Sequence, residues 1–194
     1  MHSQASMNKS PIFGIFAGLA AASIWGGMYV VSKAVMPVIP PYLLLTSRLL
    51  LGILTLYIVI TFKGGLKVTR GQFWKIFWVG FVGYGVSVGL QFVGTNLSTA
   101  SNGSLVTSAT PAFVLVFAAL LIREKITRQR LVALLIASLG VIAVIDPRTA
   151  QLSSDLFIGN LALVGAALTW ALYSVLIRKV TRDMDVLPVS LIAF

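Results

Sequence analysis

The fold is decided by the stretch IFWVGFVGYGVSVGLQFVGTNLSTASNGSLVTSATPAFVLVFAALLI, residues 76–122, which contains no charged residue. A helix that crosses the hydrocarbon core of a bilayer, about 30 Å thick, needs about 20 mostly apolar residues. The stretch is therefore long enough for two such helices. Small polar residues near its middle, at 94–98, predict the turn between them.

The rest of the chain has the same character. Of its 194 residues, 58% are hydrophobic and 10% are charged, whereas a soluble domain carries about 25% charged residues. One soluble core is excluded, and we predict an all-α, polytopic transmembrane helix bundle. Spans are expected at residues 12–33, 42–62, 72–93, 99–122, 130–146 and 157–178, and a seventh opens near Val186 and is cut off at Phe194.

The positive charge is distributed unevenly between alternate loops. Of 15 Lys and Arg, 12 fall on the side of the N-terminus, two (Lys33 and Arg148) fall on the other side, and Arg48 lies inside a span. This pattern predicts a cytoplasmic N-terminus, with an uncleaved first helix, in a bacterial cytoplasmic membrane. It also explains the net charge of +10, so we expect the lipid bilayer as partner and no nucleic acid.

An internal repeat relates the first and sixth spans. At an offset of 145 residues, seven identities occur in 22 positions, and Lys33 meets Arg178. The two copies are shifted by five spans, an odd number, so they are inverted, as in many secondary transporters. The identical pairs are Gly14 and Gly159, Ala17 and Ala162, Ala21 and Ala166, Ala22 and Ala167, Trp25 and Trp170, Val30 and Val175, and Val35 and Val180.

The repeat predicts the domain organisation. Residues 1–11 form a cytoplasmic tail, 12–146 a first five-helix unit, 147–156 an extracytoplasmic linker, and 157–194 the start of a second, inverted unit. Two complete units need ten helices, so we expect a C-terminally truncated protein that does not transport by itself. If 194 residues are the whole protein, an antiparallel homodimer would complete the bundle.

The segment Gln91–Val144 resembles the EamA family of the drug/metabolite transporter superfamily. The resemblance rests on Ser108–Ala109–Thr110–Pro111, Glu124–Lys125 and Gly140–Val141, with Trp25–Gly26 and Arg48 upstream. Arg123 departs from the pattern, because the family usually has glycine before the glutamate. The resemblance implies a ten-helix transporter of metabolites, often an exporter, built from two five-helix halves.

Candidate solute-binding residues are those that place polar or aromatic groups inside the bundle. Arg48 is costly inside a span and could hold an anionic group of the solute, or it could snorkel outward. Trp25, Tyr29, Trp170 and Tyr173 could form a cavity wall or simply pack. Ser87, Gln91 and Asn102 could hydrogen-bond a polar solute.

Other polar positions favour a structural interpretation. Ser104 and Ser108 form a small-residue stripe that lets helices pack closely. Pro111 is expected to kink the fourth span. Glu124 is expected to pair with Lys125 or Arg128, or to help end a helix.

The composition also bears on alternative function classes. The chain has no cysteine, one histidine (His2, in the polar tail) and five acids, all at span ends or in loops. An intramembrane enzyme needs a nucleophile, base or metal constellation, so we expect no enzyme, no metal and no cofactor. We therefore expect a small-molecule secondary transporter that exports a metabolite, an amino acid or a drug-like solute by alternating access. The alternative is a non-transporting structural or assembly protein, or an inactive fragment.

Overall fold

The computed structural model describes residues 11–66, 68–144, 154–182 and 184–194, and every regular element in these ranges is a helix. The all-α prediction is therefore confirmed. In chain order the elements are α1 (Pro11–Val35), α2 (Pro41–Phe62), α3 (Arg70–Gly80), the π-helix η1 (Phe81–Ser87), α4 (Val88–Leu97), α5 (Ala100–Ser108), α6 (Thr110–Ile122), α7 (Arg128–Val144), the 3₁₀ turn η3 (Ser154–Leu156), α8 (Phe157–Val180) and α9 (Val186–Ala193).

Five helical segments in the described ranges are long and apolar enough to cross a membrane: 12–35, 41–62, 70–97, 100–122 and 157–180. They coincide with five of the predicted spans. The predicted fifth span corresponds to α7, of which 17 residues are described. The predicted end of that span at residue 146 lies outside the described residues, as do residues 1–10 of the predicted tail and most of the predicted linker.

The helix ends follow from local sequence. Pro41 starts α2, because its fixed backbone angle suits a first helical turn. Thr69 and Gln72 form a capping box that starts α3 earlier than predicted. Thr99 caps α5 by accepting a hydrogen bond from the backbone N–H of Asn102 at 3.0 Å.

The fourth span consists of two helices. α5 ends at Ser108 and α6 begins at Thr110, with Pro111 in its first turn. Ala109 lies between them, and its backbone N–H donates to the Val106 carbonyl at 3.1 Å. Proline has no N–H and its ring crowds the carbonyl four residues earlier, so the interruption lies just before Pro111.

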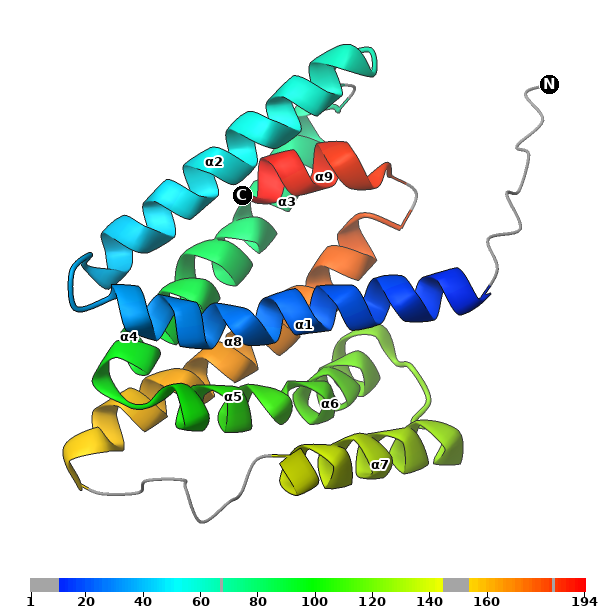
Figure 1. Ribbon diagram of the computed structural model, residues 1–194. Helices are drawn as coiled ribbons and strands as arrows, with labels where there is room; N and C mark the ends of the chain where they lie inside the picture. Colours follow the sequence, from blue (N-terminus) through cyan, green and yellow to red (C-terminus); the bar gives the residue numbers. More distant parts are fainter. Residues whose placement is uncertain (1–10, 67, 145–153, 183) are drawn as a thin grey trace.

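α8 is the central helix of the bundle. It packs against α4, η1, α5 and α6, and it passes behind α1 in the opposite direction (Figure 1). The α4–α8 crossing is a backbone contact, because a Cβ atom added to Gly159 would lie 2.6 Å from the Leu97 carbonyl carbon. Small residues allow this close approach in membrane helices. The crossing therefore fixes the N-terminal part of α8.

Apolar side chains cover the outer surface of the described helices. Ile24 of α1, Phe62 of α2 and Trp78 of α3 are among many large apolar residues that are exposed. Lipid tails solvate such side chains as well as a protein core does. The exposed apolar surface and the five long helices agree with an integral, multi-pass membrane protein.

Candidate functional site

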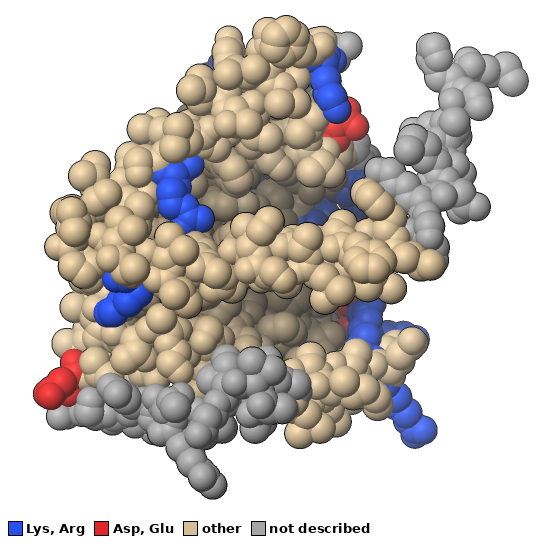
Figure 2. Space-filling model, viewed as in Figure 1, with Lys and Arg blue, Asp and Glu red and all other residues tan. Residues whose placement is uncertain are grey.

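A cavity of about 1470 Å³ lies between α1, α5, α6, α7 and α8. It is the part of the described chain where polar and aromatic side chains from distant segments converge. Figure 2 shows a hollow below the ridge formed by α1, with basic and acidic atoms near its right-hand end. Its volume exceeds that of common small-molecule sites, about 300–1,000 Å³.

Aromatic side chains form one wall of the cavity. Trp25 of α1 and Trp170 of α8 lie with their ring centroids 5.2 Å apart, and both line the cavity together with Tyr29. These tryptophans are the pair that the 145-residue offset aligns. The side chains of the two related helices therefore meet at the cavity wall.

Hydroxyl groups from α5 and α6 form a second wall. The Tyr29 hydroxyl is hydrogen-bonded to the Thr107 hydroxyl, and Ser104 and Ser108 also line the cavity. The hydroxyls of Ser104 and Ser108 donate to carbonyls of their own helix, at 2.9 and 2.5 Å. The buried Thr110 hydroxyl, also at the wall, has no hydrogen-bond partner among the described residues.

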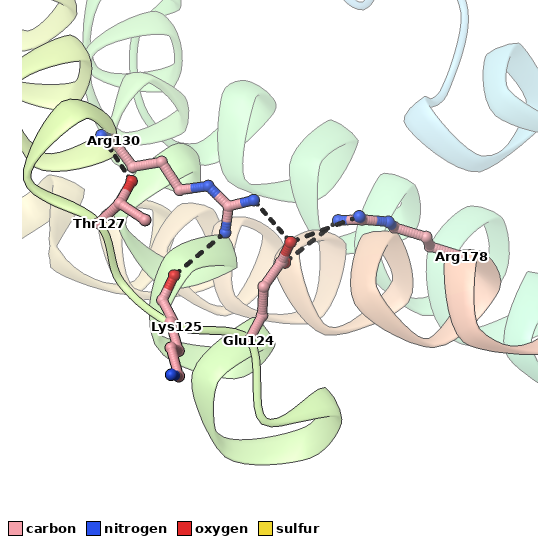
Figure 3. A network of polar contacts seen from close by, with 5 residues as sticks. All are labelled: Glu124, Lys125, Thr127, Arg130 and Arg178. Atoms are coloured by element: carbon pink, nitrogen blue, oxygen red, sulfur yellow. Dashed lines mark hydrogen bonds and ion pairs between the residues drawn. The ribbon is translucent and has the colours of Figure 1, made fainter.

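Glu124, Arg130 and Arg178 line one end of the cavity, and Figure 3 shows both arginines pointing toward Glu124. Glu124 accepts a hydrogen bond from Arg130 Nη2 at 2.6 Å. It also accepts hydrogen bonds from Arg178 Nη1 at 3.2 Å and Nη2 at 3.4 Å. The predicted partners Lys125 and Arg128 are wrong, whereas the alternative that Glu124 helps end a helix is confirmed, because its backbone N–H donates to the Ala118 carbonyl at the end of α6. Lys125 contributes only its carbonyl, which lies 3.5 Å from Arg130 Nη1.

The turn between α6 and α7 explains why Glu124 contacts Arg130 and Arg178. Arg123 adopts the left-handed conformation, with φ 54° and ψ 34°, and the Glu124 N–H donates to the Ala118 carbonyl at 3.1 Å. The tight turn of the family pattern is thus made without glycine. The hydrogen bond from Arg130, aided by Arg178, lowers the pKa of Glu124 below its ordinary value.

Arg48 lies outside this cavity. It lines a separate pocket of about 330 Å³ between α1 and α2. Its guanidinium carbon lies 5.5 Å from the centroid of the Phe92 ring, a distance at which a cation is attracted to an aromatic face. The side chain is otherwise exposed.

Two of the remaining candidates, Ser87 and Asn102, hold helices together in this structure. Ser87 donates to the Ala166 carbonyl at 2.7 Å. Asn102 donates to the side-chain oxygens of Ser98 at 3.0 Å and Asn160 at 2.9 Å. These bonds join η1 to α8, and α5 to α8.

Gln91 and Tyr173 are buried away from the cavity. The amide nitrogen of Gln91 lies 4.0 Å from the Met28 sulfur, and the Tyr173 ring lies 5.5 Å from that of Tyr84. Of the eight candidates, the structure brings together Trp25, Tyr29 and Trp170 at the large cavity.

Sequence reasoning missed a further cation with a defined role. Lys33 Nζ donates to the carbonyls of Thr95, Asn96 and Ser98 at 2.8, 2.7 and 2.8 Å. It thus binds the negative C-terminal end of α4. The available signal was its alignment with Arg178, which also joins the end of its helix to a distant loop.

The model of the EamA-like transporter family matches residues 12–145. The chain belongs to the EamA-like transporter family. Relatives include the uncharacterized transporter YetK of Bacillus subtilis, 25% identical over 182 residues, which are 91% of this chain and 55% of YetK. An uncharacterized transporter of Archaeoglobus fulgidus is 30% identical over 132 residues, 67% of this chain and 46% of that protein.

A solved crystal structure shares the fold of this EamA-like chain. It has a TM-score of 0.67 and 19% sequence identity, and the match covers 90% of this chain and 63% of that chain. The chain spans about half the length of the curated relatives it matches.

Proposed function

We propose that the protein is a secondary transporter that moves a small solute through the cavity between α1 and α5–α8 by alternating access. The observation that carries this proposal is the cavity itself, of about 1470 Å³, with its aromatic wall, hydroxyl wall and charged end. In inverted-repeat transporters the solute site lies where the repeats meet. The contact of Trp25 with Trp170 supports that position for the cavity.

We further propose that the N-terminus is cytoplasmic and that transport is outward. The loop charges support this orientation, since 12 of 15 basic residues fall on the N-terminal side. With that orientation, the charged end of the cavity faces the cytoplasm. A solute would then enter from the cytoplasm beside Glu124, Arg130 and Arg178.

The proposal is tested by export from bacterial cells that express the gene for this chain through to its stop codon. Cells are loaded with labelled metabolites, and the solutes that appear in the medium are identified by mass spectrometry. We expect at least one small solute to leave faster with the protein than without it. An unchanged medium would contradict transport and favour a structural or assembly role.

A matched pair of variants assigns the transport to the cavity. Ala137 is exposed and lines the cavity, whereas Ala20 is exposed on α1 and does not line it. We expect Ala137→Phe to reduce export at least tenfold and Ala20→Phe to leave it unchanged. Equal export by both variants would place the pathway elsewhere. The 194-residue chain, tested alongside, checks the prediction that it does not transport by itself.

A further inference from the structure

The charged end of the cavity contains more positive than negative charge. Glu124, Arg130 and Arg178 are the only charged residues that line the cavity within the described chain, and together they carry a net charge of +1. The other lining side chains are apolar, aromatic or hydroxyl-bearing. An anion is therefore the solute whose charge this cavity complements.

The two arginines hold Glu124 unequally. Arg130 contacts it at 2.6 Å, whereas Arg178 contacts it at 3.2 Å and 67% of the Arg178 side chain is exposed. Shorter charge-assisted hydrogen bonds are the stronger ones, so Arg178 is the more easily released partner. A guanidinium offers five N–H donors in a planar fork that fits a carboxylate.

We propose that Arg178, with Arg130 beside it, forms an anion-binding site in which Glu124 is a resident carboxylate that the carboxylate of a solute displaces. This inference rests on the proposed function, because it assigns a class of solute to the same cavity. When the solute carboxylate replaces Glu124 at Arg178, Glu124 remains hydrogen-bonded to Arg130. No buried charge is left unpaired by the exchange.

The cavity also defines the rest of the solute. Arg178 follows Trp170 by eight residues on α8, which is about 12 Å at 1.5 Å per residue. An apolar body of roughly that length, attached to the carboxylate, would reach the Trp25–Trp170 pair. The solute class is thus a monocarboxylate with an extended apolar body. Arg48, the anion site suggested by the sequence, does not line this cavity.

A simpler role for the same residues is a latch that joins α8 to the α6–α7 turn. The two roles differ in the sign of one effect. In a latch, removing either Glu124 or Arg178 changes the affinity for an anionic solute in the same direction. In an anion site, removing Glu124 frees Arg178 for the solute, whereas removing Arg178 destroys the site.

The test uses the protein in lipid nanodiscs with octanoate and its neutral analogue octanamide as probes. Replacing Trp74 and Trp78, which lie on α3, with Phe leaves the cavity pair Trp25 and Trp170 as the fluorescent reporters. We expect octanoate to bind at least tenfold more tightly than octanamide. Arg178→Gln should weaken octanoate at least tenfold, and Glu124→Gln should strengthen it several-fold. Arg182→Gln, an equal loss of charge at an exposed position outside the cavity, should change neither probe.

The outcomes separate this inference from the proposed function. If octanoate binds no better than octanamide, or if Arg178→Gln and Glu124→Gln shift octanoate affinity in the same direction, the anion site is refuted. If octanamide binding is then still abolished by Ala137→Phe, the cavity remains a solute site and only the solute class was wrong. If Ala137→Phe leaves both probes unaffected, the cavity assignment fails as well.

Discussion

The two ends of α8 are attached to the rest of the protein in different ways. At its N-terminal end, Gly159 is in backbone contact with Leu97, and the side-chain oxygen of Asn160 accepts hydrogen bonds from Ser98 and Asn102 at 2.6 and 2.9 Å. At its C-terminal end, the exposed Arg178 meets Glu124 beside a large cavity. The C-terminal end is packed as well, because Ile177 and Val180 lie against the apolar cluster of Ile76, Val189, Ile192 and Ala193. The two ends differ in that the N-terminal end makes backbone contact, whereas the C-terminal end adds an ion pair to its side-chain packing.

This difference indicates which contact of the helix is most easily released. Backbone contacts have one arrangement, since any separation leaves a void and breaks packing. A solvated ion pair exchanges its partner for water at little cost. The ion pair of Arg178 with Glu124 is therefore the contact of α8 that is released at the lowest cost, and it lies beside the cavity.

The largest effect of this comparison is expected where α8 makes backbone contact with its neighbour. Gly159→Ala places a Cβ 2.6 Å from the Leu97 carbonyl carbon. Because backbone atoms cannot move aside as side chains do, we expect a loss of about 3 kcal/mol, the upper part of the range for overpacking. Thermal unfolding in detergent measures the loss.

Gly14 provides the matched control, because it is the repeat counterpart of Gly159 and has no atom within 4 Å of an added Cβ. Gly14→Ala should be neutral or stabilising by up to about 1 kcal/mol, through helix propensity alone. Equal effects of the two substitutions would show that α8 does not rest on α4 as described.

A second, smaller effect is expected at the neighbouring polar cluster. Asn160→Leu removes the acceptor of Ser98 and Asn102 and leaves their buried groups without it, which should cost about 2 kcal/mol. Asn96→Leu changes an exposed amide whose residue takes part in the structure through its backbone carbonyl. A stability loss in Asn96→Leu as large as in Asn160→Leu would contradict the assignment.

A third effect concerns the turn that positions Glu124. Arg123 holds a left-handed conformation that suits glycine, so Arg123→Gly should stabilise the protein by up to about 1 kcal/mol. The same substitution at the helical residue Arg128 should destabilise it. A loss of stability in Arg123→Gly would mean that the turn has another conformation.

Much of the fold could be predicted from the sequence because it depends on local composition. The length of a charge-free run gives the span, and Pro41 and Thr69 mark where α2 and α3 start. The alignment of Trp25 with Trp170 even indicated two residues that prove to be in contact. These signals need no knowledge of which helix lies beside which.

Only part of the candidate site could be predicted, because the site depends on which helices lie side by side. The hydrophobic pattern of each helix does not specify its neighbours. The Ser87 hydroxyl donates to the carbonyl of Ala166, 79 residues away, and no residue pattern in either segment predicts this hydrogen bond. The partners of Glu124 were predicted wrongly for a related reason. The left-handed Arg123 turns the chain toward α8, and this conformation is uncommon for arginine.

The smallest effect on stability is expected from the ion pair itself, and it should depend on salt and pH. Arg130, with Arg178, lowers the pKa of Glu124 from 4.5, so the folded state favours the charged carboxylate. This contribution is complete above the ordinary pKa and is lost as the pH falls through the lowered pKa. Glu124→Gln should therefore lower the Tm slightly near neutral pH in low salt, and less at high salt or below pH 4.5. Ser87→Ala, which removes the neutral hydrogen bond to the Ala166 carbonyl, should lower the Tm equally at low and high salt. If salt leaves the Glu124→Gln effect unchanged, the ion pair makes no electrostatic contribution to stability, and charge does not distinguish the two ends of α8.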